Sequence, residues 1–223
     1  MKLAIFDFDG TLFLKDTLPC LGNEWIKQGR SKLRYFKIYL SLIPLVVFYK
    51  TNLISRELMK YKAMKTFQTI FKGMTKKEIQ DFFKQAYSGI RRYFNPMIID
   101  EINYAKSEGF HLVLLSGAYI NLLELVAEEF GFDTVIGAEL HYQDGYIDYN
   151  REISFVDGTS KLKYIEDYFS DIVIDWASSR SFGDSYSDHP ILEMTGESIV
   201  VNPDKQLLNL AESKDWRIIE PNI

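Results

Sequence analysis

Five short apolar runs, each followed by a polar residue or glycine, constrain the fold of this 223-residue chain most strongly. Each run has the length of a buried strand, and the residues after it mark a loop. Segments with a helical pattern separate the later runs. This alternation predicts an α/β fold, a Rossmann-like parallel sheet wrapped by helices. We expect strands at 3–6, 111–115, 172–174, 180–182 and 198–201, and helices at 97–108, 119–130, 160–169, 188–195 and 204–213.

Two stretches do not follow the alternation. Residues 133–157 carry strand-forming residues around Asp144-Gly145, a strong two-residue turn signal, so we expect a hairpin there. Residues 16–93 contain long helix-compatible segments and no clear strand. The expected organisation is therefore a core of residues 1–15 and 94–223, with an inserted all-helical domain of residues 16–93.

Charge divides the chain in the same way. Residues 16–93 contain 16 Lys and Arg against 5 Asp and Glu, a net charge of +11, whereas the rest of the chain carries −16. A basic module attracts anions such as phosphates or an anionic membrane surface. The two regions are therefore expected to have different partners.

Cysteine content and the first residues bear on the compartment. Cys20 is the one cysteine in the sequence, which excludes an intramolecular disulfide and a multi-cysteine zinc site. Acidic residues interrupt the first apolar run almost at once, a pattern that differs from a secretory signal. Both features predict a cytoplasmic protein.

The first run ends in Asp7-Phe8-Asp9-Gly10-Thr11-Leu12. Carboxylates two residues apart leave an extended backbone on the same side, so Asp7 and Asp9 converge. Such a pair requires a cation or a shared proton. Gly10 permits the sharp turn that follows. Taken alone, the same pattern is also compatible with a turn that carries two solvated carboxylates.

This hexapeptide resembles motif I of the haloacid dehalogenase superfamily, and three further matches follow in order. Ser116, before Gly117, resembles motif II, and Lys161 resembles motif III. The segment from Gly183 to Asp188 resembles motif IV. Each match lies at the end of an expected strand or helix, and together they cover the chain outside the insertion.

The resemblance implies a role for each matched residue. Asp7 would attack a phosphate monoester and form an aspartyl-phosphate, while Asp9 would protonate the leaving group and then activate water. Mg²⁺ would be bound by the side chains of Asp7 and Asp184 and the carbonyl of Asp9, with Asp188 in support. Ser116, Gly117 and Lys161 would hold the phosphoryl group.

Two features narrow the resemblance further. A halide leaving group needs no proton, so an acid at position 9 favours a phosphatase or a phosphomutase over a dehalogenase. An insertion directly after motif I resembles the branch with a helical first cap, subfamily IB, whose members include phosphoserine phosphatases. In those enzymes an acidic residue and a cap arginine hold the amino-acid part of the substrate. Asp16 matches the acid, and the arginine's position falls near Phe67, so Arg56 or Lys65 would replace it.

The insertion contains an uncharged run from Ile38 to Tyr49, preceded by five basic residues without an intervening acid. Pro44 interrupts this run, which is shorter than a membrane-spanning helix. It could pack inside the insertion, or it could dock on an anionic membrane and admit a lipid phosphate. Nucleic-acid binding is disfavoured because no recognised motif accompanies the charge. A small phosphomonoester is the expected partner, and the sequence does not fix an oligomeric state.

Overall fold

The computed structural model describes residues 1–156 and 158–220. It divides into two compact units. The first, which we call the core unit, comprises Met1–Asp16, Arg92–Gly137 and Val156–Ile223. The second, which we call the helical unit, comprises Thr17–Arg91 and Ala138–Phe155.

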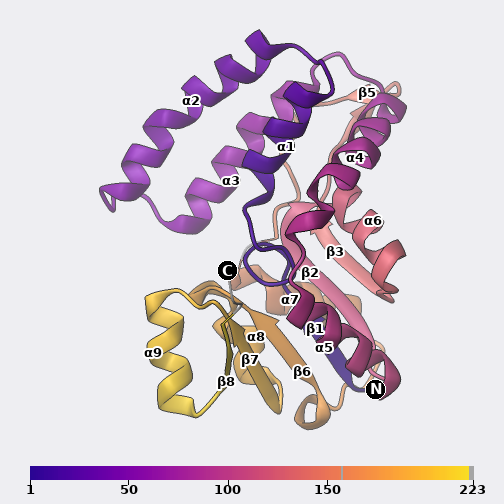
Figure 1. The fold of residues 1–223 in the computed structure, drawn as a ribbon, viewed down its shortest axis with the longest axis vertical. Helices are drawn as coiled ribbons and strands as arrows, with labels where there is room; N and C mark the ends of the chain where they lie inside the picture. Colours follow the sequence, from indigo (N-terminus) through magenta and orange to yellow (C-terminus); the bar gives the residue numbers. More distant parts are fainter. Residues whose placement is uncertain (157, 221–223) are drawn as a thin grey trace. The chain divides into compact units, whose positions relative to one another are not determined.

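The core unit is built on a six-stranded sheet with the strand order β3-β2-β1-β6-β7-β8 (Figure 1). Strand β1 pairs in parallel with β2 and with β6, and β7 pairs in parallel with β6 and with β8. The strands are β1 (Leu3–Phe6), β2 (His111–Tyr119), β3 (Thr134–Ala138), β6 (Arg180–Gly183), β7 (Glu197–Val201) and β8 (Arg217–Ile219). The helices of this unit are α5 (Pro96–Ser107), α6 (Ile120–Phe130), α7 (Gly158–Tyr168), α8 (His189–Met194) and α9 (Lys205–Lys214). The predicted α/β class with a parallel sheet is confirmed.

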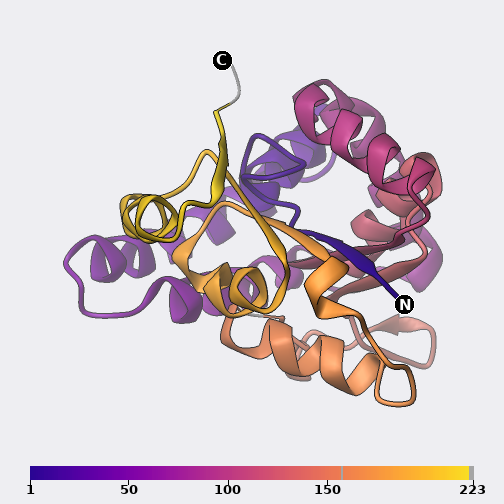
Figure 2. The same ribbon diagram turned by 90° about the horizontal axis from the view of Figure 1, so that it is seen from below.

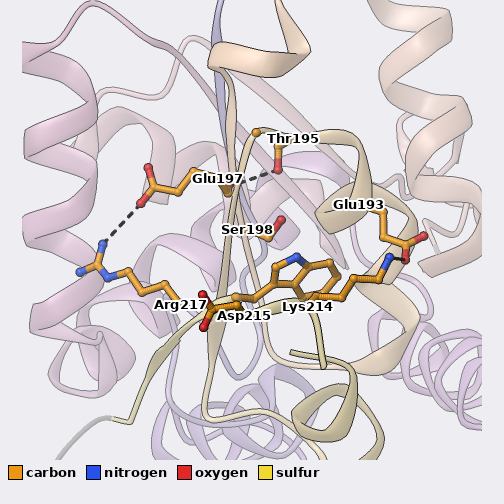
Figure 3. A pocket seen from close by; sticks show the side chains of 9 residues that line it. Glu193, Thr195, Glu197, Ser198, Lys214, Asp215 and Arg217 are labelled. Atoms are coloured by element: carbon orange, nitrogen blue, oxygen red, sulfur yellow. Dashed lines mark hydrogen bonds and ion pairs between the residues drawn. The ribbon is translucent and has the colours of Figure 1, made fainter. Parts of the chain in front are cut away.

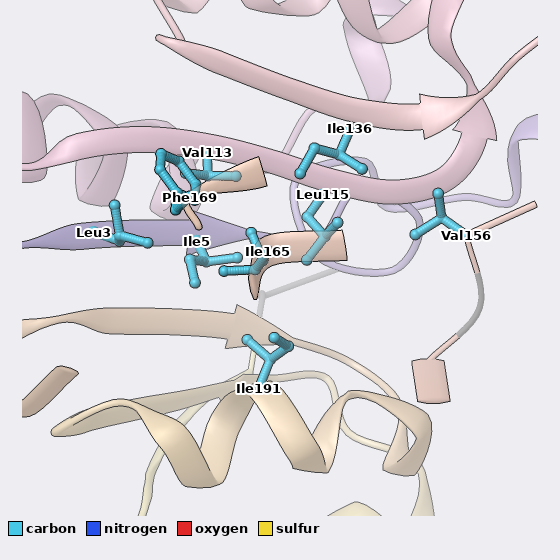
Figure 4. Close-up of a cluster of buried hydrophobic side chains, with 9 residues drawn as sticks. All are labelled: Leu3, Ile5, Val113, Leu115, Ile136, Val156, Ile165, Phe169 and Ile191. Carbon is cyan, nitrogen blue, oxygen red and sulfur yellow. The ribbon is translucent and has the colours of Figure 1, made fainter. Parts of the chain in front are cut away.

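Alternate residues of the central strands form a buried apolar layer. Leu3 and Ile5 of β1 lie beside Val113 and Leu115 of β2, and Ile165 of α7 packs against them (Figure 4). Side chains two residues apart share one face of a strand, which explains this spacing. Figure 2 shows α7 on one side of β1 and α5 on the other. The sheet is therefore covered on both faces, and its strand ends remain available for a site.

The structure differs from the sequence-based assignment at three strands. Residues 172–174 do not form a strand, and Val173 is 88% exposed. A short apolar run can equally lie in a surface loop, because composition does not reveal burial. Strand β3 lies within the segment expected to be only a hairpin, and β8 was not predicted. Its three residues include two that are exposed, so it lacks a buried apolar run.

A charged cluster joins the far strands to α5. Arg180 of β6 is buried and pairs with Glu197 of β7 at 2.6 Å and with Glu101 of α5 at 3.0 Å. Glu101 also pairs with Arg217 of β8. Burial opposes the charge of Arg180, but the two glutamates outweigh it and raise the pKa of Arg180. A buried guanidinium is stable only when it is paired in this way, so the cluster ties β6, β7 and α5 together.

The helical unit contains α1 (Thr17–Lys27), α2 (Lys32–Lys50), α3 (Arg56–Phe67) and α4 (Lys76–Ile90). Its core is aromatic: the ring centroids of Trp25 and Phe82 lie 5.6 Å apart, and those of Phe71 and Phe82 lie 5.4 Å apart. Such edge-to-face contacts add to the burial of large apolar surfaces. Among the described residues, no helix has both the length and the hydropathy needed to cross a membrane.

The hairpin predicted around Asp144-Gly145 is present as β4 (Tyr142–Gln143) and β5 (Tyr146–Ile147). Asp144 and Gly145 both have positive φ, as a tight two-residue turn requires. The hairpin groups with the helical unit, whereas the sequence assigned residues 94–223 to the core. The amide of Lys76 donates to the carbonyl of Gly145, and that of Ile147 donates to the carbonyl of Met74. These long-range hydrogen bonds cannot be read from local sequence.

Candidate active site

Two neighbouring parallel strands bring three carboxylates together in the core unit. Asp7 directly follows β1, and Asp184 directly follows β6. The amide of Asp7 donates to the carbonyl of Phe182 at 3.0 Å, which continues the pairing of these strands. Asp7, Asp184 and Asp188 each place a carboxylate oxygen within 4.8 Å of the others. These oxygens form a cluster that could hold a metal ion.

Lys161 reaches this cluster from α7. Its Nζ donates to Oδ1 of Asp7 at 2.7 Å and to Oδ1 of Asp188 at 2.6 Å. Burial lowers the pKa of Lys161, but the charges of Asp188 and Asp7 outweigh this effect and raise the pKa above its ordinary value. Lys161 therefore stays protonated, and it offsets part of the charge of the cluster. It is 7% exposed, which excludes a solvated surface lysine.

Asp188 is held in place from its other side. Its Oδ2 accepts a hydrogen bond from the amide of Ser185 at 3.2 Å, and the Ser185 hydroxyl accepts one from the amide of Ser187. This reciprocal capping box fixes the short 3-10 helix Tyr186–Asp188 that follows β6. Asp188 is 5% exposed, so a rotation toward solvent would break two hydrogen bonds. Its carboxylate orients Lys161 toward Asp7.

Gly10 lets the turn after β1 approach Asp184. It has φ +85°, and a Cβ atom at this position would overlap the Asp184 carboxylate. Both the backbone conformation and the close approach require glycine here. The turn and the carboxylate of the neighbouring strand therefore fit together only because position 10 lacks a side chain.

We expect Gly10→Ala to destabilise the protein by about 1–2 kcal/mol and also to displace Asp184. Gly109→Ala is the matched control, because Gly109 has φ +72° and nothing within 4 Å of the added Cβ. Urea unfolding measures the first effect, and Mg²⁺-dependent hydrolysis of an aryl phosphate measures the second. Equal activity in the two variants would show that the fit against Asp184 is unimportant.

Ser116 lies at the same end of the sheet as Asp7. Strand β2 continues through Ser116 and Gly117 to Tyr119, beyond the end expected at residue 115. The Ser116 side chain is 2% exposed, and its Oγ accepts a hydrogen bond from the amide of Ala118 at 3.3 Å. Tyr119 is the N-cap residue of α6, so Ser116 does not cap this helix. Its hydroxyl proton can still be donated to a ligand.

The comparisons with known proteins agree with this arrangement. The model of the haloacid dehalogenase-like hydrolase family matches residues 4–193, most of the chain. The chain belongs to this family. One relative in sequence is the inhibition of morphological differentiation protein of Streptomyces azureus. It is 21% identical to this chain over 97% of this chain and 77% of its own length.

Two solved structures have folds similar to that of this haloacid dehalogenase-like chain. A protein of unknown function from Bordetella pertussis Tohama I has a TM-score of 0.82 and 18% identity, covering 98% of this chain and 97% of its own. A phosphoserine phosphatase, solved as a phospho-aspartyl intermediate analogue, has a TM-score of 0.67 and 16% identity over 98% and 92%. The predicted likeness to phosphoserine phosphatases is confirmed for the fold.

The remaining predicted site residues of this hydrolase, Asp9 and Asp16, differ in their solvent exposure. Asp9 is half-buried in the turn after β1, where the amide of Gly10 donates to the carbonyl of Phe13. Asp16 is exposed and directly precedes α1. Neither belongs to the group of three carboxylates that could hold a metal among the described residues. Their assigned roles therefore depend on the family resemblance.

Asp204 organises the site from a position that the motif assignment left without a role. Its amide donates to the carbonyl of Asp184, and its Oδ2 accepts from the amide of Tyr186 at 2.9 Å. Its Oδ1 caps α9 by accepting from Gln206 and Leu207. The Asn202-Pro203-Asp204 sequence is itself a helix-start signal. The contact with the Asp184 loop depends on tertiary structure.

A separate hollow of about 380 Å³ lies at the far strands of the core unit (Figure 3). Four of its five charged side chains are paired: Lys214 lies 3.2 Å from Glu193, and Arg217 lies 3.8 Å from Glu197. None of the residues matched to the four motifs lines it. The carboxylate cluster, and not this hollow, is the candidate active site.

Proposed function

We propose that this chain is a Mg²⁺-dependent phosphomonoester hydrolase that works through an aspartyl-phosphate on Asp7. The observation that carries the proposal is the convergence of Asp7, Asp184 and Asp188 within 4.8 Å, with Lys161 bound to two of them. An activated nucleophile, a cation site and a fixed positive charge are what phosphoryl transfer requires.

The residues fit a magnesium ion. Carboxylate oxygens are the hard ligands that Mg²⁺ prefers, and one lysine cannot balance three carboxylates before an anionic substrate arrives. We assign Asp7, Asp184 and the Asp9 carbonyl to the ion. Asp188 supports it through the Lys161 contact and its own negative charge. When bound, Mg²⁺ supplies charge neutralisation and orientation for the phosphoryl oxygens.

The residues of the chain divide the reaction into two steps. An oxygen of Asp7 attacks phosphorus, and the bond from phosphorus to the leaving oxygen breaks as Asp9 gives that oxygen a proton. Asp9 then takes a proton from water, whose oxygen attacks the phosphorus and releases phosphate from Asp7. Lys161 and the Ser116 hydroxyl hold phosphoryl oxygens as their charge develops. We assign Gly117, which directly follows Ser116, to the same phosphoryl-binding site.

The organic part of the substrate is less constrained. We assign Asp16 to substrate binding, as the counterpart of the acid in phosphoserine phosphatases. Phe67, near the position of their cap arginine, is buried at 2% exposure. Lys65 pairs with Glu152 in the helical unit, so this lysine is already engaged. Of the two residues that could replace that arginine, Arg56 then remains. Because the arginine's own position carries Phe67, we infer a phosphomonoester other than phosphoserine. A cytoplasmic location remains a prediction.

A panel of phosphomonoesters with Mg²⁺ tests the proposed function. It should include an aryl phosphate, phosphoserine, sugar phosphates, nucleotides, lysophosphatidate and phosphatidylglycerophosphate. We expect hydrolysis of the aryl phosphate and a clear preference for one class, with phosphoserine no better than the others. A strong preference for phosphoserine would contradict the substrate assignment, and no hydrolysis of any member would contradict the function itself.

A further inference from the structure

Helix α2 exposes apolar side chains around most of its circumference. Of its 19 residues only Ile38 is buried. This exposure contradicts packing of the run 38–49 in the interior of the helical unit, one of the two arrangements that the sequence allowed. The large exposed apolar residues of α2 are Leu33, Phe36, Tyr39, Leu40, Ile43, Val46, Val47, Phe48 and Tyr49.

The exposed residues form a continuous stripe. Helix α2 packs against α3 (Figure 1). Ile38 is buried and Leu42 and Leu45 are half-buried, and their spacing of four and three residues places them on one side of the helix. Directly opposite, apolar residues recur at alternating intervals of three and four, which keeps them on one line of the helix. Between its first and last members the stripe extends about 21 Å at 1.5 Å per residue. We call this set the α2 stripe: Leu33, Phe36, Leu40, Ile43 and Val47.

Positive charge surrounds the α2 stripe. Residues 25–56 contain seven basic residues and no acidic one. Arg34 has a structural role, because its guanidinium donates to the carbonyls of Ile70 and Lys72 at 2.9 and 3.1 Å. Lys32, Lys37 and Lys50 are exposed. Helical geometry places Lys37 on one flank of the stripe and Lys32 and Lys50 on the other.

We propose that α2 docks on the surface of an anionic lipid bilayer, lying in its plane. The stripe would enter the boundary between headgroups and acyl chains, while the three lysines extend toward anionic headgroups. Each lysine near such a surface strengthens the attraction. The apolar centre of this helix face matches the acyl-chain region of the bilayer, and its basic flanks match the anionic headgroups.

Other occupants fit the charge pattern less well. A second copy could pair through the heptad-like spacing of the stripe, but the lysines of two copies would face one another without an acidic partner. A nucleic acid would satisfy the lysines and leave the apolar centre of the face without a partner. A bilayer satisfies both. None of the proposed catalytic residues lies on α2, so docking is separate from hydrolysis.

Sedimentation with vesicles tests this docking. The full chain is mixed at low salt with phosphatidylcholine vesicles, either pure or containing about a quarter phosphatidylglycerol. We expect binding to the anionic vesicles and not to the neutral ones, and weaker binding as the salt concentration rises. Asp7→Asn should bind as the wild type does, because the docking face does not include the proposed active site.

Two variants and their controls locate the binding face. Lys32→Gln, Lys37→Gln and Lys50→Gln together should weaken partitioning about tenfold or more. The control changes the same number of charges on exposed lysines of the same unit, at Lys62, Lys77 and Lys84. Leu40→Ser with Val47→Ser should weaken partitioning by a similar factor of about ten. Val173→Ser, at an exposed valine of the core unit, should leave it unchanged.

Several outcomes would overturn the docking proposal. Wild-type protein that stays in the supernatant with anionic vesicles excludes it, and so does equal binding to neutral vesicles. Equal losses in the two lysine variants would mean that total charge, and not α2, governs binding. Loss of binding in Asp7→Asn would assign the lipid contact to the active site. A dimer in analytical ultracentrifugation that Leu40→Ser with Val47→Ser dissociates would assign the stripe to a second copy.

Discussion

Asp7→Asn is expected to lower the rate of aryl phosphate hydrolysis about 10⁴-fold or more. The amide has almost the shape of the carboxylate but lacks the electron-rich oxygen that attacks phosphorus. Lys161 keeps its second partner, Asp188, at 2.6 Å, so the site should not collapse. Steady-state assays at saturating Mg²⁺ measure the loss.

A stability measurement shows whether Asp7→Asn loses activity through its chemistry or through unfolding. Thermal unfolding followed by circular dichroism should give a melting temperature close to that of the wild type, because Asp7 makes only one of the two contacts of Lys161. Asp133→Asn, at a half-exposed aspartate of the same unit, should retain full activity. Activity near the wild-type level in Asp7→Asn would remove Asp7 from the role of nucleophile.

Removal of Mg²⁺ is expected to have an effect as large as the loss of Asp7. Excess chelator should abolish hydrolysis, and added Mg²⁺ should restore it, since the clustered carboxylates and the phosphate repel one another without a cation. Asp184→Asn should reduce Mg²⁺ affinity about a hundredfold or more. Mutating a residue that only hydrogen-bonds to a metal ligand lowers metal affinity about 10- to 100-fold, and mutating the ligand itself should cost at least as much. A Mg²⁺-dependent rise in melting temperature, present in the wild type and absent in Asp184→Asn, measures binding independently of turnover.

Calcium provides a second check on the site. Ca²⁺ takes more oxygen ligands with looser geometry, so it can engage both oxygens of Asp7 and block its attack. We therefore expect Ca²⁺ to bind and to inhibit. Full activity in excess chelator, or equal activation by the two ions, would contradict a magnesium site built on Asp7 and Asp184.

The pattern of short apolar runs in the sequence was sufficient to locate the two carboxylates at the strand ends. Asp7 and Asp184 follow short apolar runs that the structure confirms as β1 and β6. Neighbouring parallel strands end at one edge of a sheet, so their carboxylates meet there. Lys161 was located by family resemblance, and its bridging position between Asp7 and Asp188 depends on how α7 packs against the sheet.

Features that depend on tertiary contact could not be read from the sequence. The run 172–174 has the composition of a strand but lies exposed, whereas β8 is a three-residue strand of which only Ile219 is buried. Asp204 has the appearance of a simple helix cap, although its amide also contacts the carbonyl of Asp184. Likewise, the apolar run 38–49 permitted both burial and exposure, and its exposure was known only once α2 was placed against α3.

Trapping the covalent intermediate tests the central claim most directly. The enzyme is mixed with an aryl phosphate carrying ³²P, quenched in acid within the first turnovers, and digested for peptide mapping. We predict label on the peptide that contains Asp7, released by hydroxylamine as expected for an acyl phosphate, and no label in Asp7→Asn. Label on another residue, or rapid turnover by the wild type with no labelled protein at any quench time, would contradict an aspartyl-phosphate mechanism.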